Sequence, residues 1–235
     1  MAKAFFITGT DTEVGKTYAT CALLHRIRQA GLTAAGLKAV AAGVDADGKN
    51  EDVEALRAAS SPELTLPERI RNPYRFAPAI APHIAAQEAG VKIEFAVIKT
   101  AAQQAMQQAD VVLLEGAGGF RIPLGTDGDS ADLAQKLGLP VILVVGMRLG
   151  CLNHALLTAE AILARQIPLA GWIANSILPD MPFYAENLAT LKTLIPAPLL
   201  GVIPHALPGG VEEAARGLAF FGSEIRNPEC NRGGS

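Results

Sequence analysis

The sequence has few of the features that mark secreted, membrane or nucleic-acid-binding proteins. Its three cysteines, at positions 21, 151 and 230, form no CxxC pair and no zinc-type spacing, a pattern typical of proteins in a reducing cytosol. No apolar run approaches the ~20 residues of a membrane span, and residues 5–7 are too short a run for a signal peptide. A net charge of −3 without a basic block argues against a nucleic-acid partner. We therefore expect a cytoplasmic protein with no membrane or nucleic-acid partner.

The hydrophobic pattern favours one large α/β domain. Half of the 235 residues are hydrophobic, which is enough for a sizeable core. Strand-like runs at 4–7, 33–40, 110–115, 140–146, 168–174 and 198–203 alternate with helix-like segments at 16–30, 51–59, 91–109, 129–137, 151–165, 183–195 and 211–220. This alternation predicts a single doubly wound, mostly parallel sheet with helices on both faces, spanning residues 1–226.

Three segments carry turn or loop chemistry instead. Five prolines between residues 62 and 83 predict an irregular excursion. The glycine-rich residues 116–119 predict a flexible loop, and the polar residues 227–235 a disordered tail.

The sequence from residue 4 to residue 20 predicts a phosphate-binding loop. A short apolar strand leads through Gly9 and Gly15 into Lys16-Thr17 and an apolar helical pattern, which is the context such a loop requires. Backbone N–H groups and the helix dipole would attract phosphates, with Lys16 on the terminal phosphates and the Thr17 hydroxyl on Mg²⁺. The glycines enclose five residues where the strict pattern has four. Asp11 and Glu13, unusual beside polyphosphate, suggest that a cationic group such as a metal or an amine also lies here.

Charged residues follow or flank the predicted strands at the edge where ligands bind in such sheets. Glu115 ends a buried strand and is a candidate magnesium ligand. Asp52 is a possible second one, although an acid at a helix start also favours the helix dipole. Lys38 ends an almost uncharged strand and could stabilise charge developing on a transferred phosphoryl group; the alternative is a surface lysine whose stem is buried.

Further positions at the same edge are candidates for contacts with a nucleotide. Asn175 follows one strand, and Pro204-His205-Ala206 follow the next, so both could frame a base. A cluster of three arginines could close over phosphate as a lid, although a solvated face explains the same pattern; its members are Arg69, Arg71 and Arg75.

Taken together, these motifs resemble the dethiobiotin synthetases. The resemblance runs from the N-terminus to about residue 206 and includes the following segments: Gly9-Thr10-Asp11-Thr12-Glu13-Val14-Gly15-Lys16-Thr17, the segment around Lys38, Asn72-Pro73-Tyr74, Pro82-His83-Ile84, Glu115-Gly116-Ala117-Gly118-Gly119, Leu149-Gly150-Cys151-Leu152-Asn153-His154 and Gly171-Trp172-Ile173-Ala174-Asn175. It implies a homodimer with the P-loop NTPase fold that converts 7,8-diaminononanoate, CO₂ and ATP into dethiobiotin, ADP and phosphate. The implied route passes through a carbamate and a carbamic–phosphoric mixed anhydride.

The resemblance also implies roles for individual residues. Lys16 and Lys38 would flank the carbamate and the γ-phosphate, and Thr17, Asp52 and Glu115 would hold Mg²⁺. ATP would contact Glu13, Val14, Gly15, Lys16, Thr17, Tyr18, Gly116, Ala117, Gly118, Asn175, Ser176, Pro204, His205 and Ala206. The substrate would contact Thr12, Lys38 and Ala42, together with Leu149, Gly150, Cys151 and Asn153 of the partner subunit, where the N-terminus of a helix could hold a carboxylate.

One departure from the family pattern concerns the substrate. The family's lysine segment usually reads Lys-Pro-x-x-Ser/Thr-Gly, whereas here Ala39 and Ala42 replace the proline and the hydroxyl residue. Ala42 thus lacks a group expected to touch the substrate.

Two other functions fit a phosphate-binding loop. A nucleotide-switch ATPase of the chromosome-partitioning type would carry a lysine early in the loop, where this chain has Thr10-Asp11-Thr12-Glu13. A small-molecule kinase would use the arginine cluster as its lid.

Overall fold

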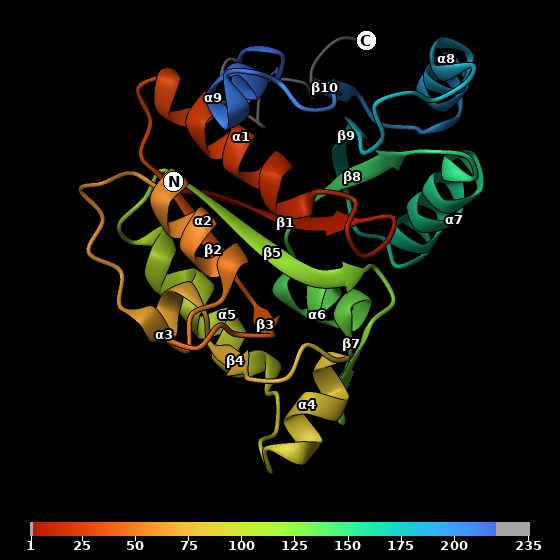
Figure 1. The fold of residues 1–235 in the computed structure, drawn as a ribbon. Coiled ribbons are helices and arrows are strands. Elements are labelled where there is room, and N and C mark those ends of the chain that lie inside the picture. Colours follow the sequence, from red (N-terminus) through yellow and green to blue (C-terminus); the bar gives the residue numbers. More distant parts are fainter. Residues whose placement is uncertain (1, 220–235) are drawn as a thin grey trace, which may run out of the picture.

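A computed structural model describes residues 2–219, so the predicted disordered tail lies outside the described residues. Its centre is a six-stranded sheet in the order β10-β9-β8-β1-β5-β2, and all its strand pairs are parallel. The strands are β1 (Lys3–Gly9), β2 (Ala34–Lys38), β5 (Val111–Gly119), β8 (Val141–Met147), β9 (Leu169–Ser176) and β10 (Leu199–Ile203). The predicted doubly wound parallel sheet is confirmed (Figure 1).

Helices cover both faces of this sheet because its strand residues are apolar on both sides. On one face α1 (Lys16–Gln29), α2 (Glu51–Ala59) and α9 (Gly210–Arg216) pack over side chains such as Ile7, Leu113 and Val144. On the other, α5 (Phe95–Met106), α6 (Ser130–Leu137), α7 (Cys151–Ala164) and α8 (Tyr184–Leu194) belong to the cluster around Phe6 and Trp172. Figure 1 shows the two layers on either side of the sheet.

The region of five prolines is more regular than predicted. It holds α3 (Glu68–Arg71), β4 (Tyr74–Phe76) and the start of α4 (Pro82–Glu88). Pro67 is the residue before α3, and Pro82 occupies the first position of α4, where a missing N–H costs no helical hydrogen bond. The prolines therefore start helices here.

The predicted strand 33–40 is divided in two, and the predicted glycine loop is part of a strand. β2 stays in the main sheet, while β3 (Val40–Ala42) pairs with β4 in a separate two-stranded sheet. β5 continues through residues 116–119 because Gly119 pairs with Gly9 of β1. The short β6 (Pro123–Gly125) and β7 (Gly128–Asp129) then form a hairpin. Helix α5 begins four residues later than expected, at Phe95, and α9 ends at Arg216.

Candidate active site

The predicted phosphate-binding loop connects β1 to α1 at the carboxyl edge of the sheet. Gly15 precedes the helix in a left-handed conformation with φ of +78°, which favours glycine. Lys16 is buried, and its ammonium donates to the Asp11 carbonyl at 3.1 Å. Burial, followed by the nearby positive charge of Lys38, lowers the pKa of Lys16 to about 8. Lys16 therefore folds back on its own loop, close to where phosphates would lie.

The cationic partner of Asp11 belongs to the protein itself. Arg148, just after β8, donates from Nη2 to Asp11 Oδ2 at 2.6 Å, and both side chains are partly exposed. Our expectation that Asp11 holds a metal or a substrate amine is therefore not needed to explain this carboxylate. Glu13 lies at φ of +59° and is exposed.

Four predicted residues from four elements meet beside this loop. Lys38 Nζ lies 2.6 Å from both Asp52 Oδ2 and Glu115 Oε1. Thr17 Oγ1 lies 2.8 Å from Asp52 Oδ1 and 2.7 Å from the same Glu115 oxygen. The sequence placed Lys38 among uncharged neighbours, whereas in the structure it bridges two carboxylates. We call these four residues the charge cluster.

Because the charge cluster is largely buried, the pKa of each of Lys38 and Asp52 depends on the charge of its neighbours. The Lys38 side chain is 6% exposed and that of Glu115 0%, whereas Asp52 is partly exposed. Burial disfavours the Lys38 ammonium, but the two carboxylates outweigh it and raise the pKa of Lys38. Burial likewise opposes ionisation of Asp52, yet the charge and hydrogen bond of Lys38 hold its pKa below the usual value. Lys38 and Asp52 are thus both held in their charged forms at neutral pH.

The cluster also has the donor set of a magnesium site. Its metal-binding atoms are a hydroxyl and carboxylate oxygens, the hard ligands that Mg²⁺ prefers. Glu115 Oε2 is buried and has no hydrogen-bond partner among residues 2–219, which is costly unless another group binds it. The residues present therefore fit Mg²⁺. The charge cluster has only two carboxylates, and within residues 2–219 no group of three or more His, Cys, Asp or Glu side chains is arranged to hold a metal ion.

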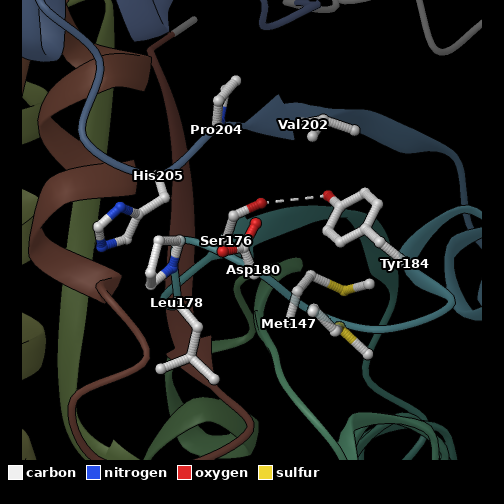
Figure 2. A pocket seen from close by; sticks show the side chains of 10 residues that line it. Met147, Ser176, Leu178, Asp180, Tyr184, Val202, Pro204 and His205 are labelled. Carbon is white, nitrogen blue, oxygen red and sulfur yellow. Dashed lines mark hydrogen bonds between the residues drawn. The ribbon is translucent and has the colours of Figure 1, made fainter.

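A cavity of about 540 Å³ opens at the ends of β8, β9 and β10. It is lined by three residues predicted to contact ATP, namely Ser176, Pro204 and His205 (Figure 2). Ser176 Oγ donates to Tyr184 Oη at 3.3 Å across one wall. Sequence reasoning missed Met147 at the end of β8, Asp180 in the loop after β9 and Tyr184 at the start of α8, because no motif marks these side chains as lining a cavity.

Neither Asn175 nor Tyr18 lines this cavity. Asn175 is buried, and its Nδ2 donates to the Val14 carbonyl at 2.8 Å, so its amide supports the phosphate-binding loop. Tyr18 packs against the core beneath α1, where burial and then the charge of Glu213 raise its pKa. Ala206 has a φ of +49° and does not line the cavity among the described residues.

The glycine segment of β5 approaches the loop from the other side. At Gly118, with φ of +59°, an added Cβ would lie 2.9 Å from Ile122 and 3.4 Å from Thr12 Oγ1. The predicted substrate residue Thr12 thus lies over Gly118, while Gly116 and Ala117 continue the strand. Ala42 ends β3 and lines a cavity of about 820 Å³ that also borders Asp52.

The segment 149–153 lies at the start of α7, as the sequence suggested. Gly150 precedes the helix at φ of +93°, Leu149 is 96% exposed and Asn153 is exposed. Cys151, in contrast, is buried, and its N–H donates to the Arg148 carbonyl at 2.9 Å. A carboxylate at this helix start would therefore have to use other N–H groups.

The arginine cluster does not form a lid. Arg71 is buried and donates to the carbonyls of Leu64 and Leu66, while Arg75 pairs with Glu68 at 2.9 Å. The interpretation of these arginines as a wholly solvated face was also wrong for Arg71. A kinase-type phosphate clamp has no support from these contacts.

Comparison with known proteins fixes the family. A family model described as an AAA domain matches residues 3–208. The ATP-dependent dethiobiotin synthetase BioD of Aromatoleum aromaticum is 54% identical over 223 residues, covering 94% of this chain and 98% of that protein. The enzyme of the same name from Nitrosospira multiformis is 53% identical over 205 residues, with 87% and 89% covered. The chain belongs to the dethiobiotin synthetase family. The resemblance identified from the sequence is thereby confirmed.

Solved structures with low identity share the fold alone. The MinC:MinD cell division complex of Aquifex aeolicus matches with a TM-score of 0.52 at 16% identity, covering 95% of this chain and 90% of that one. Chloroplast FtsY from Physcomitrella patens matches with a TM-score of 0.53 at 17% identity, covering 90% and 61%. Within residues 2–219 no helix is both long and apolar enough to cross a membrane.

Proposed function

We propose that this protein closes the ureido ring of dethiobiotin from 7,8-diaminononanoate, CO₂ and ATP in the cytoplasm. The observation that carries the proposal is the charge cluster, in which Thr17, Lys38, Asp52 and Glu115 meet within 2.8 Å beside the Lys16 loop. In a member of the dethiobiotin synthetase family, this arrangement places an ammonium and two carboxylates where a phosphoryl group is transferred next to an amine.

Thr17, Asp52 and Glu115 would hold Mg²⁺. When bound, the ion would neutralise part of the charge on the ATP phosphates. The unpartnered Glu115 Oε2 supports this assignment. Lys38 already contacts both carboxylates at 2.6 Å, so its ammonium lies beside the proposed metal position. There it would stabilise the carbamate oxygen and the oxygens of the γ-phosphoryl group.

The proposed reaction follows the order of bond changes that the resemblance to the dethiobiotin synthetases implies. One substrate amine adds to CO₂ and loses a proton, giving a carbamate held by the Lys38 ammonium. The carbamate oxygen attacks the γ-phosphorus of ATP, ADP leaves, and Lys16 and the loop N–H groups bind the phosphate oxygens. The second amine then attacks the carbamoyl carbon. Phosphate leaves, a proton is lost, and the cyclic urea is complete.

We also propose that the cavity at the ends of β8, β9 and β10 holds the nucleotide base. Ser176, Pro204 and His205 line it as the ATP assignment requires. The Asn175 amide, in this proposal, holds the loop through the Val14 carbonyl.

A second copy of the chain would complete the substrate site. On α7 and the segment before it, Leu149 is 96% exposed and Leu157 58% exposed, so a second copy that covers this face would bury two large apolar side chains. Burial of this face in a homodimer would place residues 149–153 of one subunit beside the substrate of the other.

Mixed dimers test the shared site. Lys16→Ala removes a phosphate contact, and Asn153→Asp places a carboxylate near that of the substrate, so each mutant homodimer should be inactive. After random reassociation of equal amounts, about half the dimers are mixed and each has one intact site, so about a quarter of wild-type activity should return. Failure to recover activity, with subunit exchange shown by differential tags, would refute the shared site.

The reaction itself is tested by product analysis. The protein is incubated with 7,8-diaminononanoate, bicarbonate and Mg-ATP, and the products are identified by mass spectrometry. Dethiobiotin with one ADP and one phosphate per ring supports the proposal. Phosphate alone would indicate a plain ATPase, and a stable phosphorylated diamine would indicate a kinase.

A further inference from the structure

Asn72 is a buried amide that joins two parts of the backbone near the charge cluster. It lies between α3 and β4 and is 4% exposed. Its Nδ2 donates to the Lys38 carbonyl at 3.0 Å and to the Tyr74 carbonyl at 2.8 Å. A side-chain NH₂ has two protons, and both are used here. The amide cannot be reversed, because its oxygen would then face two carbonyl oxygens.

The oxygen of the same amide has no partner. Asn72 Oδ1 is buried without a hydrogen bond among the residues that the structure describes. A buried acceptor left unpaired is unfavourable. The side chain is therefore held in place by the two hydrogen bonds that its NH₂ group donates, and one of the two goes to the Lys38 carbonyl.

The hydrogen bond from Asn72 to the Lys38 carbonyl lies where the chain passes from the main sheet to the small two-stranded sheet. Lys38 is the last residue of β2, where the chain leaves the main sheet for β3. The Ala39 N–H donates to the Glu115 carbonyl at 2.9 Å on the side of the main sheet. On the other side Val40 pairs with Tyr74, so Asn72 joins the end of β2 to the start of β4 at the junction of the two sheets.

A lysine side chain has four rotatable bonds, so its ammonium is only as well placed as its backbone and its partners make it. The ammonium of Lys38 lies 2.6 Å from two carboxylates, and a small shift of the Lys38 backbone would change both contacts. We infer that Asn72 is a positioning residue for Lys38, acting through the Lys38 carbonyl. This inference rests on the function proposed above for Lys38.

The opposite end of β2 offers a matched control. Ser61 is buried, and its Oγ accepts from the Ala34 N–H at 2.9 Å. Ser61→Ala therefore removes one buried side-chain-to-backbone hydrogen bond from the same strand, at the end remote from Lys38. If Asn72 merely stabilised β2, the two alanine variants would have similar effects.

The first experiment measures Lys38 directly and needs no catalytic activity. Wild type, Asn72→Ala and Ser61→Ala are acetylated with an N-hydroxysuccinimide ester far below their unfolding temperatures, and the rate at Lys38 is followed by mass spectrometry. Lys38 is 5% exposed and ion-paired, so it should react slowly in wild type. We expect at least about fivefold faster labelling in Asn72→Ala and less than about twofold in Ser61→Ala. Equal acceleration in both, or none in Asn72→Ala, overturns the inference.

The second experiment is a kinetic double-mutant cycle. We expect Asn72→Ala to lower kcat about tenfold and to change the KM for ATP by less than about twofold, because misplacement affects the reacting geometry more than nucleotide binding. In a Lys38→Met background, Asn72→Ala should lower kcat by less than about twofold more. Losses that multiply instead would show that Asn72 does not act through Lys38.

A milder variant and the labelling assay keep the tests separable. Should Asn72→Ala fail to fold, Asn72→Ser retains one donor, and its labelling rate and kcat should lie between those of Asn72→Ala and wild type; wild-type values for both would overturn the inference. A wild-type protein that makes no dethiobiotin refutes the proposed function. The labelling comparison would still decide whether Asn72 positions Lys38.

Discussion

Replacing Gly15 with alanine should cost more stability than its backbone conformation alone explains. Gly15 has φ of +78°, and an added Cβ would lie 2.2 Å from Asn175 Nδ2. The left-handed conformation costs an alanine about 1 kcal/mol after allowance for the stiffer unfolded chain. The clash would also push Asn175 away from the Val14 carbonyl, which it contacts at 2.8 Å. Losing that buried hydrogen bond adds about 1–3 kcal/mol.

Gly31 separates the two contributions. It has almost the same φ, +77°, but nothing lies within 4 Å of its added Cβ. Gly31→Ala should therefore lower the free energy of unfolding by only about 1 kcal/mol, against about 2–4 kcal/mol for Gly15→Ala. Urea denaturation without nucleotide measures both values, so that loss of ligand binding does not enter the comparison.

A double mutant then tests the cause. In an Asn175→Ala background the obstructing amide is gone, so Gly15→Ala should cost about 1 kcal/mol, as at Gly31. If Gly15→Ala and Gly31→Ala destabilise the wild type equally, or if Asn175→Ala leaves the cost of Gly15→Ala unchanged, our account of the contact between Gly15 and Asn175 is wrong.

Three further predictions concern the metal, the substrate and a buried thiol. Glu115→Gln should abolish Mg²⁺-dependent turnover while leaving the fold intact by circular dichroism, because a neutral amide is a poor magnesium ligand; unchanged turnover at limiting Mg²⁺ would exclude this role. Ala42→Ser should lower the KM for the diamine through a hydrogen bond worth about 0.5–1.5 kcal/mol, with little change for ATP; weaker diamine binding would indicate a pocket shaped for another molecule. Burial raises the pKa of Cys21 to about 12. At a pH above the ordinary pKa of a thiol, the unfolded chain therefore releases a proton from Cys21 that the folded chain keeps. Stability should then fall as the pH rises toward 12, by up to about 1.4 kcal/mol per pH unit, and denaturation of Cys21→Ala should show a smaller fall.

The sequence was sufficient for the parts of the site that are local along the chain. The loop, the end of β5 and the start of α2 each carry their own pattern, and the parallel sheet brings those ends to one edge. Thr17, Asp52 and Glu115 could therefore be expected near one another, as they lie in the structure. The contacts of Lys38 with Asp52 and Glu115 were not predicted, because the position of Lys38 at the end of a strand fixes the edge that it reaches and not the direction of its side chain.

Side-chain direction was the other limit. Asn175 was correctly placed at the end of a strand, but nothing in a single sequence says whether its amide faces a ligand or the backbone of Val14. Arg148 illustrates the same limit, since its partner Asp11 is 137 positions away. Patterns along the chain fix which edge a residue reaches, whereas packing across the sheet fixes what it touches.

Asn72 shows how these two limits meet in one residue. Its neighbours in sequence, in a segment of five prolines, favour an irregular excursion, yet its amide reaches a carbonyl 34 positions away. That reach exists because the chain leaves β2 after Lys38 and returns as β4 beside β3. The small two-stranded sheet thus brings the Asn72 amide to the backbone carbonyl of Lys38. Neither periodicity nor motif spacing in the sequence gives a signal for this contact.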